Sequence, residues 1–225
     1  MNIRPIAHFR SPLTSKFGIP RQSGLAPSLR GRIVFEPSFC NDDYIRGIED
    51  FDYLWLIWNF SANAAASIHA TVRPPLLGGN VRMGVFATRS PFRPNGLGLS
   101  SVRLLGVERT GGQLSLLVAG ADLMDGTPIY DIKPYLSYAD SHPDARAGFT
   151  DAHAWRSLRV VIPHSIGCKL APNRLAALTE VLALDPRPSV QHATDKVFGM
   201  PFDHFNVRFT VANDTLTVTE ISENR

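Results

Sequence analysis

Four segments of the chain are rich in polar and charged residues that core packing does not require. They are residues 17–22, 71–80, 84–100 and 122–135. Their arginines offer a planar fork of donors suited to carboxylate or phosphate groups, and their prolines and glycines set turns and let backbone approach a ligand. Loops of this kind on a strand scaffold are where binding sites are usually built. We therefore predict a cleft lined by arginines and asparagines.

Each segment also has a plainer interpretation. Residues 93–96 and 125–128 contain Asn-Gly and Asp-Gly pairs, which are ordinary turn formers. Lys133 could pair with Asp131 along a strand, and His69 could be a surface residue. The co-occurrence of four such segments in one region favours a site over turns alone.

Several standard catalytic motifs are absent. Gly96 and Gly98 lack the third glycine of a dinucleotide-binding fingerprint, and the chain has no phosphate loop, nucleophile elbow or His-Glu-x-x-His helix. Cys40 and Cys168 lie far apart without the Cys or His spacing of a zinc site, so we expect no bound zinc. Two isolated cysteines also indicate a protein of a reducing compartment whose thiols are buried. The sequence shows no signal peptide and no apolar run of the ~20 residues that span a membrane.

The positive charge is concentrated in two places. The formal net charge of the 225 residues is only +3, but the chain has 19 arginines against 4 lysines. Residues 1–40 and 61–110 hold the excess, which could bind an anionic ligand or an RNA backbone. A GC-rich genome is the alternative explanation of the Arg/Lys ratio.

Short apolar runs predict a β-rich first part. We expect strands at 33–35, 54–60 (buried on both faces), 83–88, 100–108 and 113–119, with a turn at 110–112 and a helix at 41–48. Many short strands favour a barrel or sandwich over a doubly wound sheet. Residues 122–135 are expected to form a loop.

The last third of the chain has a different pattern. Residues 139–156 resemble a linker or mobile loop. A strand at 158–162, a helix at 172–184 ended by 185–188, and strands at 205–211 and 216–221 predict a small α+β domain. The expected domains are 1–142, a linker at 143–156, and 157–225.

Residues 84–95 resemble the signature of the TsaA-like/TrmO family, and segments 17–22, 54–55, 71–80, 125–135, 185–188 and 203–208 resemble its pattern in order and spacing. The resemblance implies an S-adenosylmethionine-dependent tRNA methyltransferase that acts on N6 of threonylcarbamoyladenosine beside the anticodon. It also implies a mainly β fold: a small non-Rossmann barrel that binds the cofactor, followed by a small α+β domain. A cytoplasmic homodimer without membrane or metal partners is expected.

The same resemblance assigns site residues by position. The implied cofactor-binding residues are Pro20, Arg21, Gln22, Ser61, Ala62, Arg89, Leu97, Leu99, Asp125, Gly126, Thr127, Pro128 and Ile129. Ser61 and Ala62 stand where the family commonly has a histidine-containing pair, so a side-chain contact from them is uncertain.

Methylation of a conjugated nitrogen requires that its proton leave. Asp131 and Tyr130 are the catalytic candidates, with Asp125 as a further acceptor. Arg73, Arg93, Asn95 and Arg187 are candidates for RNA binding. Tyr130, Tyr135 or Phe92 could stack on the purine, with core packing as the alternative.

Two other functions stay open at this point. One is a non-catalytic module that binds S-adenosylmethionine or an adenine nucleotide and regulates a partner, and the other is a small-molecule methyltransferase. The first would bind the cofactor without transferring its methyl group to tRNA, and the second would accept a substrate without RNA.

Overall fold

The computed structural model describes residues 2–63, 67–153, 155–187 and 196–224. Its larger part is a closed barrel of six antiparallel strands in the order β1-β2-β7-β6-β3-β8. The strands are β1 (Ala7–Arg10), β2 (Arg30–Phe35), β3 (Tyr53–Asn59), β6 (Leu97–Thr110), β7 (Gln113–Ala119) and β8 (Pro128–Pro134). Pairing of β8 with β1 closes the ring. The predicted mainly β fold is confirmed.

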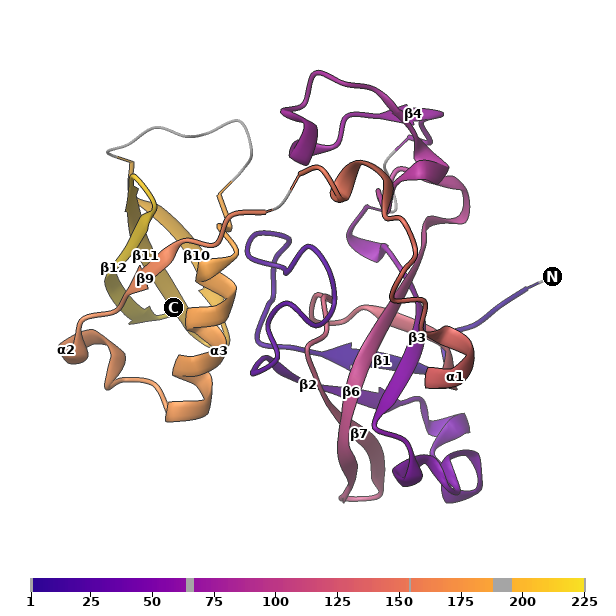
Figure 1. Ribbon diagram of the computed structural model, residues 1–225. Coiled ribbons are helices and arrows are strands. Elements are labelled where there is room, and N and C mark those ends of the chain that lie inside the picture. The colour runs from indigo at the N-terminus through magenta and orange to yellow at the C-terminus, as the bar shows by residue number, and fades with distance from the viewer. Residues whose placement is uncertain (1, 64–66, 154, 188–195, 225) are drawn as a thin grey trace.

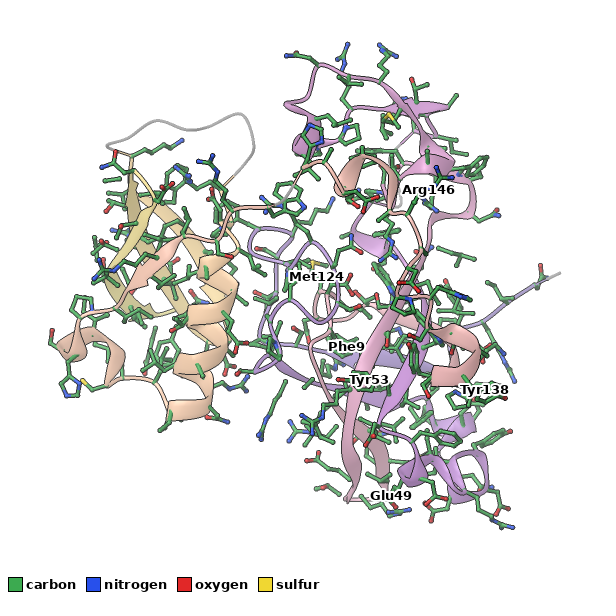
Figure 2. All side chains as sticks on the ribbon, viewed as in Figure 1. Phe9, Glu49, Tyr53, Met124, Tyr138 and Arg146 are labelled. Carbon is green, nitrogen blue, oxygen red and sulfur yellow. The ribbon has the colours of Figure 1, made fainter. Side chains whose placement is uncertain are left out.

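The barrel interior is filled by alternating side chains. Leu54, Leu56 and Trp58 of β3 are buried in one core with Phe9 of β1, which Figure 2 labels. The intervening side chains of β3 are only half-buried or exposed, so the prediction of a strand buried on both faces was wrong. The turn at 110–112 is confirmed, because β6 and β7 meet there through two glycines of positive φ.

Three local predictions need correction. Of the expected strand 83–88, only Met83–Gly84 is extended; it forms β5, which pairs with β4 (Thr71–Val72). After it, Val85 is buried and the next two side chains are both exposed, so the in–out alternation of a strand ends there. The expected helix at 41–48 is two 3-10 turns separated by Gly47 at φ 81. Part of the expected loop 122–135 is strand β8.

Short 3-10 turns connect much of the barrel region. They are Pro37–Phe39, Asp42–Ile45, Ile48–Asp50, Ser61–Asn63, Pro75–Leu77, Val85–Ala87, Pro94–Gly96 and Gly148–Thr150. Residues 67–96, with β4 and β5, form a lobe at the top of the view in Figure 1.

A second sheet forms the C-terminal part, in the order β10-β11-β12-β9. Its strands are β9 (Arg159–Val161), β10 (Phe198–Phe202), β11 (Phe205–Ala212) and β12 (Thr215–Glu223), with helices α2 (His164–Gly167) and α3 (Pro172–Ala183). Pro172 lies in the first turn of α3, where the missing N–H costs nothing. The helix ends at Ala183, before Pro186; Pro188 lies outside the described residues.

The second core includes residues from the N-terminal part of the chain. Leu13, Ala26 and Leu29 are buried against Leu178 and Val181 of α3, together with residues of the second sheet. Figure 1 shows α3 on the side of that sheet that faces the barrel. Residues 13–29 are therefore held between the two sheets, and this fixes the loop that contains residues 20–22.

The expected linker crosses the molecule from α1 (Ser137–Asp140) to β9, between the barrel and the lobe (Figure 1). The two thiols differ from expectation: Cys168 is exposed and Cys40 is half-buried, where its sulfur accepts the Leu114 N–H. No helix among the described residues is long and apolar enough to cross a membrane.

Candidate active site

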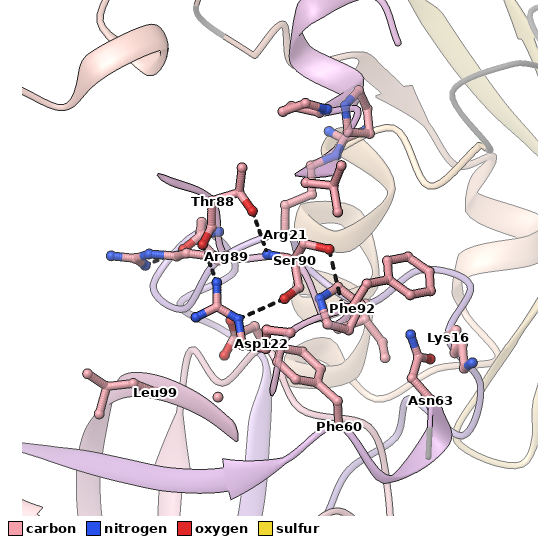
Figure 3. Close-up of a pocket in the computed structure, with 18 of the residues that line it drawn as sticks. Lys16, Arg21, Phe60, Asn63, Thr88, Arg89, Ser90, Phe92, Leu99 and Asp122 are labelled. Atoms are coloured by element: carbon pink, nitrogen blue, oxygen red, sulfur yellow. Dashed lines mark hydrogen bonds between the residues drawn. The ribbon is translucent and has the colours of Figure 1, made fainter. Parts of the chain in front are cut away.

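A cleft of about 1100 Å³ lies beside the open end of the barrel. The lobe, the loop around residues 16–22, the ends of β3 and β6, and the linker all contribute to its walls (Figure 3). Ligand pockets usually measure about 300–1000 Å³. The cleft is therefore large enough for a nucleoside-sized cofactor together with a reacting base.

The cleft brings together many of the residues assigned from sequence. Those that line it are Pro20, Arg21, Gln22, Ser61, Ala62, Arg73, Arg89, Arg93, Leu97, Leu99 and Thr127. They come from five separate parts of the chain. The remaining assigned residues are not among those that line it: Asn95, Asp125, Gly126, Pro128, Ile129, Tyr130, Asp131 and Arg187.

Arg21 joins the cleft to the C-terminal part. Its Nη1 donates to the Leu184 carbonyl at 2.9 Å and its Nη2 to the Asp185 carbonyl at 3.4 Å. Its guanidinium carbon lies 3.6 Å from the centroid of the Trp155 ring, in the linker. Burial lowers the pKa of Arg21, and the charge of Asp185 partly offsets this effect. The fork of Arg21 is thus already occupied by protein groups.

The Arg89 guanidinium is more accessible to a ligand than that of Arg21. It is exposed, and its Nη1 donates to Gln22 Oε1 across the cleft. Its charge also acts on Asp122, which Figure 3 shows in the same cleft. Arg89 and Gln22 therefore form a polar pair that a carboxylate ligand could enter.

Asp122 is the carboxylate that lines the described part of the cleft. Burial raises its pKa, opposed by hydrogen bonds and by the charge of Arg89. The Ser100 hydroxyl donates to Asp122 Oδ1 at 2.6 Å, and Trp58 Nε1 donates to Ser100 Oγ at 3.0 Å. Trp58 and Ser100 are almost fully buried. A short chain of hydrogen bonds thus runs from the barrel interior to a carboxylate in the cleft.

Residues 125–131 have other partners. The Asp125 carboxylate accepts the Ser11 N–H at 3.0 Å, pairs with Arg10 at 3.6 Å, and lines a second cavity of about 330 Å³. Ile129 is buried in the barrel core. Asp131 pairs with Lys133 at 2.9 Å, as the plainer interpretation of that segment predicts. The assignment of Asp125, Ile129 and Asp131 to cofactor or catalysis stays a prediction that the cleft does not support.

Two of the arginines assigned to RNA binding are engaged within the protein. Arg93 donates to the Ser90 carbonyl at 2.9 Å, and also to the carbonyls of Val85 and Thr88, so it shapes its own loop. The Arg187 side chain is only 9% exposed and pairs with Asp185 at 2.8 Å. This pair lowers the pKa of Asp185, against the effect of burial, and raises that of Arg187. Neither fork is free for a phosphate.

The other assigned groups lie in the lobe and in or next to the barrel strand β8. Arg73 and Phe92, both exposed residues of the lobe, line the cleft. Asn95 is exposed at φ 65 in the turn before β6, which confirms that residues 93–96 form a turn. Tyr130 is half-buried in β8, and Tyr135 packs against Trp55 with centroids 5.6 Å apart.

The sequence assignments did not include several cleft residues. Lys16, Trp58 and Asp122 line the cleft, as do Phe149 and Trp155 of the linker. Asp122 lies in a segment that the sequence highlights, but its burial became apparent only from its neighbours in space. Among the described residues, no group of three or more His, Cys, Asp or Glu side chains could hold a metal ion.

The fold and the cleft define a class: a non-Rossmann β-barrel with a basic, nucleoside-sized cleft. Residues 8–141 match the family described as tRNA-methyltransferase O N-terminal domain, and residues 164–224 match the TrmO C-terminal domain. The chain belongs to the tRNA-methyltransferase O family.

Individual relatives agree with this membership. The tRNA (adenine(37)-N6)-methyltransferase of Escherichia coli is 39% identical over 92% of each chain. A Pseudomonas aeruginosa protein with the provisional name S-adenosylmethionine-dependent methyltransferase RcsF is 42% identical, over 84% of this chain and 83% of that one. The crystal structure of TrmO from P. aeruginosa superimposes with a TM-score of 0.80 at 32% identity, covering 100% of this chain and 97% of that one.

Proposed function

We propose that this protein is an S-adenosylmethionine-dependent methyltransferase that methylates N6 of adenine 37 in tRNA, next to the anticodon. The relative from E. coli supports the reaction, because its identity extends over both parts of the chain. The observation that carries the proposal is the convergence of Pro20–Gln22, Ser61–Ala62, Arg89 and Leu97–Leu99 on one cleft. The threonylcarbamoyl form of the adenosine is the proposed substrate.

The residues of the cleft fit the chemistry of the cofactor. S-adenosylmethionine carries a carboxylate and an ammonium, a ribose, an adenine, and a methyl group on a sulfonium that is a strong electrophile. Arg89 suits the carboxylate by a charge-assisted bidentate hydrogen bond. Leu97 and Leu99 offer apolar contact, and Pro20 and Gln22 hold the opposite wall. Arg21 acts in this proposal by fixing residues 20–22, since its own fork is occupied.

The chain's further contribution is placement and exclusion of water. Phe60, Phe92 and Trp155 line the cleft and provide flat apolar faces against which a splayed base can lie. Orienting the nucleophilic nitrogen toward the methyl group can supply much of the rate enhancement. The exposed Arg73 and Arg82 at the cleft extend the positive surface toward an RNA backbone.

Methyl transfer to tRNA tests the proposal. Labelled cofactor is incubated with the protein and with tRNA from cells that lack it, and the label is expected in N6-methylated adenosine at position 37. Cofactor binding without transfer would instead indicate a regulatory module. Transfer to a small molecule in the absence of RNA would indicate the other alternative. Transfer to tRNA that lacks the threonylcarbamoyl group would show that this group is not required.

The assembly and location belong to the same proposal. We propose a cytoplasmic homodimer. Phe86 of the lobe is 80% exposed, and such an apolar side chain is suited to cover by a partner subunit. Light scattering of the purified protein checks the dimer.

A further inference from the structure

The walls of the cleft are almost uniformly basic. Among the described residues that line it, the cationic side chains are Lys16, Arg21, Arg73, Arg82, Arg89 and Arg93. Asp122 is the only carboxylate and His69 the only histidine in the same set. A reaction in this cleft that must remove a proton therefore has very few acceptors available.

Hydrogen bonds from Trp58 and Ser100 fix one oxygen of the Asp122 carboxylate. Trp58 Nε1 can only donate, so Ser100 Oγ must accept from it at 3.0 Å. The Ser100 hydroxyl proton is thereby directed to Asp122 Oδ1 at 2.6 Å. Because Oδ1 already accepts the Ser100 proton, we assign the proton of a protonated Asp122 to Oδ2. The backbone N–H groups of Asp122 itself and of Ser23 also donate to this carboxylate.

The rival acceptors are placed less well. His69 is exposed on the lobe, where its ring bonds with Ser67 Oγ at 3.1 Å and contacts the Phe92 ring. Asp131 is not among the lining residues, and its charge is paired with Lys133. Of these three acceptors, only the half-buried Asp122 combines a place in the cleft with a fixed orientation.

Building on the proposed function, we propose that Asp122 is the catalytic proton acceptor for the N6 nitrogen of the substrate. As the N6–CH₃ bond forms, the S–CH₃ bond of the sulfonium donor breaks and its electron pair returns to sulfur. The N6 proton passes to Asp122 Oδ2 and afterwards to solvent. Charge and atoms balance with the methyl donor as the only co-reactant.

The electrostatics of the cleft suit this role. A general base works best when its pKa lies near the working pH. Burial moves the pKa of Asp122 in that direction, while the Ser100 hydroxyl, the Ser23 backbone and the charge of Arg89 oppose the rise. These are the groups that face Asp122 from β6, from the 20–24 loop and from the lobe.

Asp122→Asn tests the proposal because it keeps the shape and the Ser100 hydrogen bond. General-base removal typically costs about 100-fold or more in turnover. We expect that loss in methyl transfer, with cofactor affinity by calorimetry within about threefold of the wild type. Asp144→Asn, at an exposed linker carboxylate, is the control of equal charge change. Turnover retained by Asp122→Asn, or turnover and cofactor affinity lost together, would overturn the assignment.

A stability measurement keeps the test independent of activity. Because the pKa of Asp122 is raised in the folded state, the folded protein binds this proton more tightly than the unfolded chain does. The ionised carboxylate then lowers stability as pH rises from its unfolded pKa to its folded pKa. Asp122→Asn should therefore be more stable than the wild type at neutral pH, with the difference disappearing below the unfolded pKa of the carboxyl group. A destabilised variant at neutral pH would indicate a structural role instead.

Ser100→Ala provides a second variant. Loss of the hydroxyl donor should raise the pKa of Asp122 further and move the acid limb of the turnover profile to higher pH. If Ser100 had a purely structural role, Ser100→Ala would lower turnover without moving the acid limb of the pH profile. If the acid limb disappeared in His69→Gln, the base would be His69 instead. If the wild-type protein methylated no tRNA, both the proposed function and this inference would be refuted. If the wild type methylated tRNA and Asp122→Asn did so equally well, only the inference would be refuted.

Discussion

The contact between Arg21 and Trp155 gives a quantitative prediction about how the linker is held over the cleft. Arg21→Ala removes a charged hydrogen bond of 2.9 Å, a weaker one of 3.4 Å and the stacking on Trp155. Charged hydrogen bonds contribute about 1.5–3 kcal/mol and an exposed cation–π contact about 0.5–1 kcal/mol. Burial of the guanidinium opposes these gains, as its lowered pKa shows. The expected net loss of unfolding free energy is about 2 kcal/mol.

A double-mutant cycle isolates the ring contact from the rest. Urea unfolding, followed by far-UV circular dichroism, is measured for the wild type, Arg21→Ala, Trp155→Leu and the double variant. The coupling energy between the two side chains should be about 0.5–1 kcal/mol. Arg146→Ala, at an exposed position of the linker (Figure 2), is the control and should change stability by less than about 0.5 kcal/mol.

Limited proteolysis tests whether this contact holds the linker in place. A loss of 1 kcal/mol in local stability raises the open population about fivefold. Tryptic cleavage after Arg156 should accelerate by at least that factor in Arg21→Ala. A coupling energy of zero together with an unchanged cleavage rate would refute the idea that Arg21 fastens the linker.

Three further outcomes follow from the site. Arg89→Ala should weaken cofactor binding at least tenfold by calorimetry, since a charged hydrogen bond contributes about 1.5–3 kcal/mol; unchanged affinity would remove Arg89 from the site. Gly98→Ala should lower the free energy of unfolding by about 1–3 kcal/mol in urea, because a Cβ there would overlap the Trp58 ring. Arg73→Ala should reduce the slope of log tRNA affinity against log salt by about 1, whereas Arg187→Ala should lower the melting temperature and leave that slope unchanged.

The barrel could be predicted because local patterns and overall fold agree there. The apolar run of β3 and the glycine turn between β6 and β7 are visible in single segments, although the run does not show that only one face of β3 is buried. β1 and β8 were missed because each becomes a strand only through its partners in the closed ring. The 3-10 turns were missed because their side chains follow neither a helical nor a strand period.

The site was harder to predict because a residue type does not show where its side chain turns. Arg93 and Arg187 look in sequence like free cations for RNA, but both forks bond with groups of their own loops. Asp122 looks like one of several acids in its segment, and only the packing of Ser100 and Trp58 distinguishes it. Family resemblance located the cleft, whereas the roles within it depend on contacts between distant parts of the chain.

The position of residues 13–29 explains why the two parts of this protein belong to one catalytic unit. Their apolar side chains lie in the core of the C-terminal part, while Pro20 and Gln22 in the same segment line the cleft. Arg21 fastens this segment to the end of α3 and to the linker. A C-terminal domain that only gripped RNA would not need to build a wall of the proposed cofactor cleft. Here the packing of residues 13–29 in the C-terminal core positions the wall that Pro20 and Gln22 form, so folding of the C-terminal part and the shape of the cleft depend on each other.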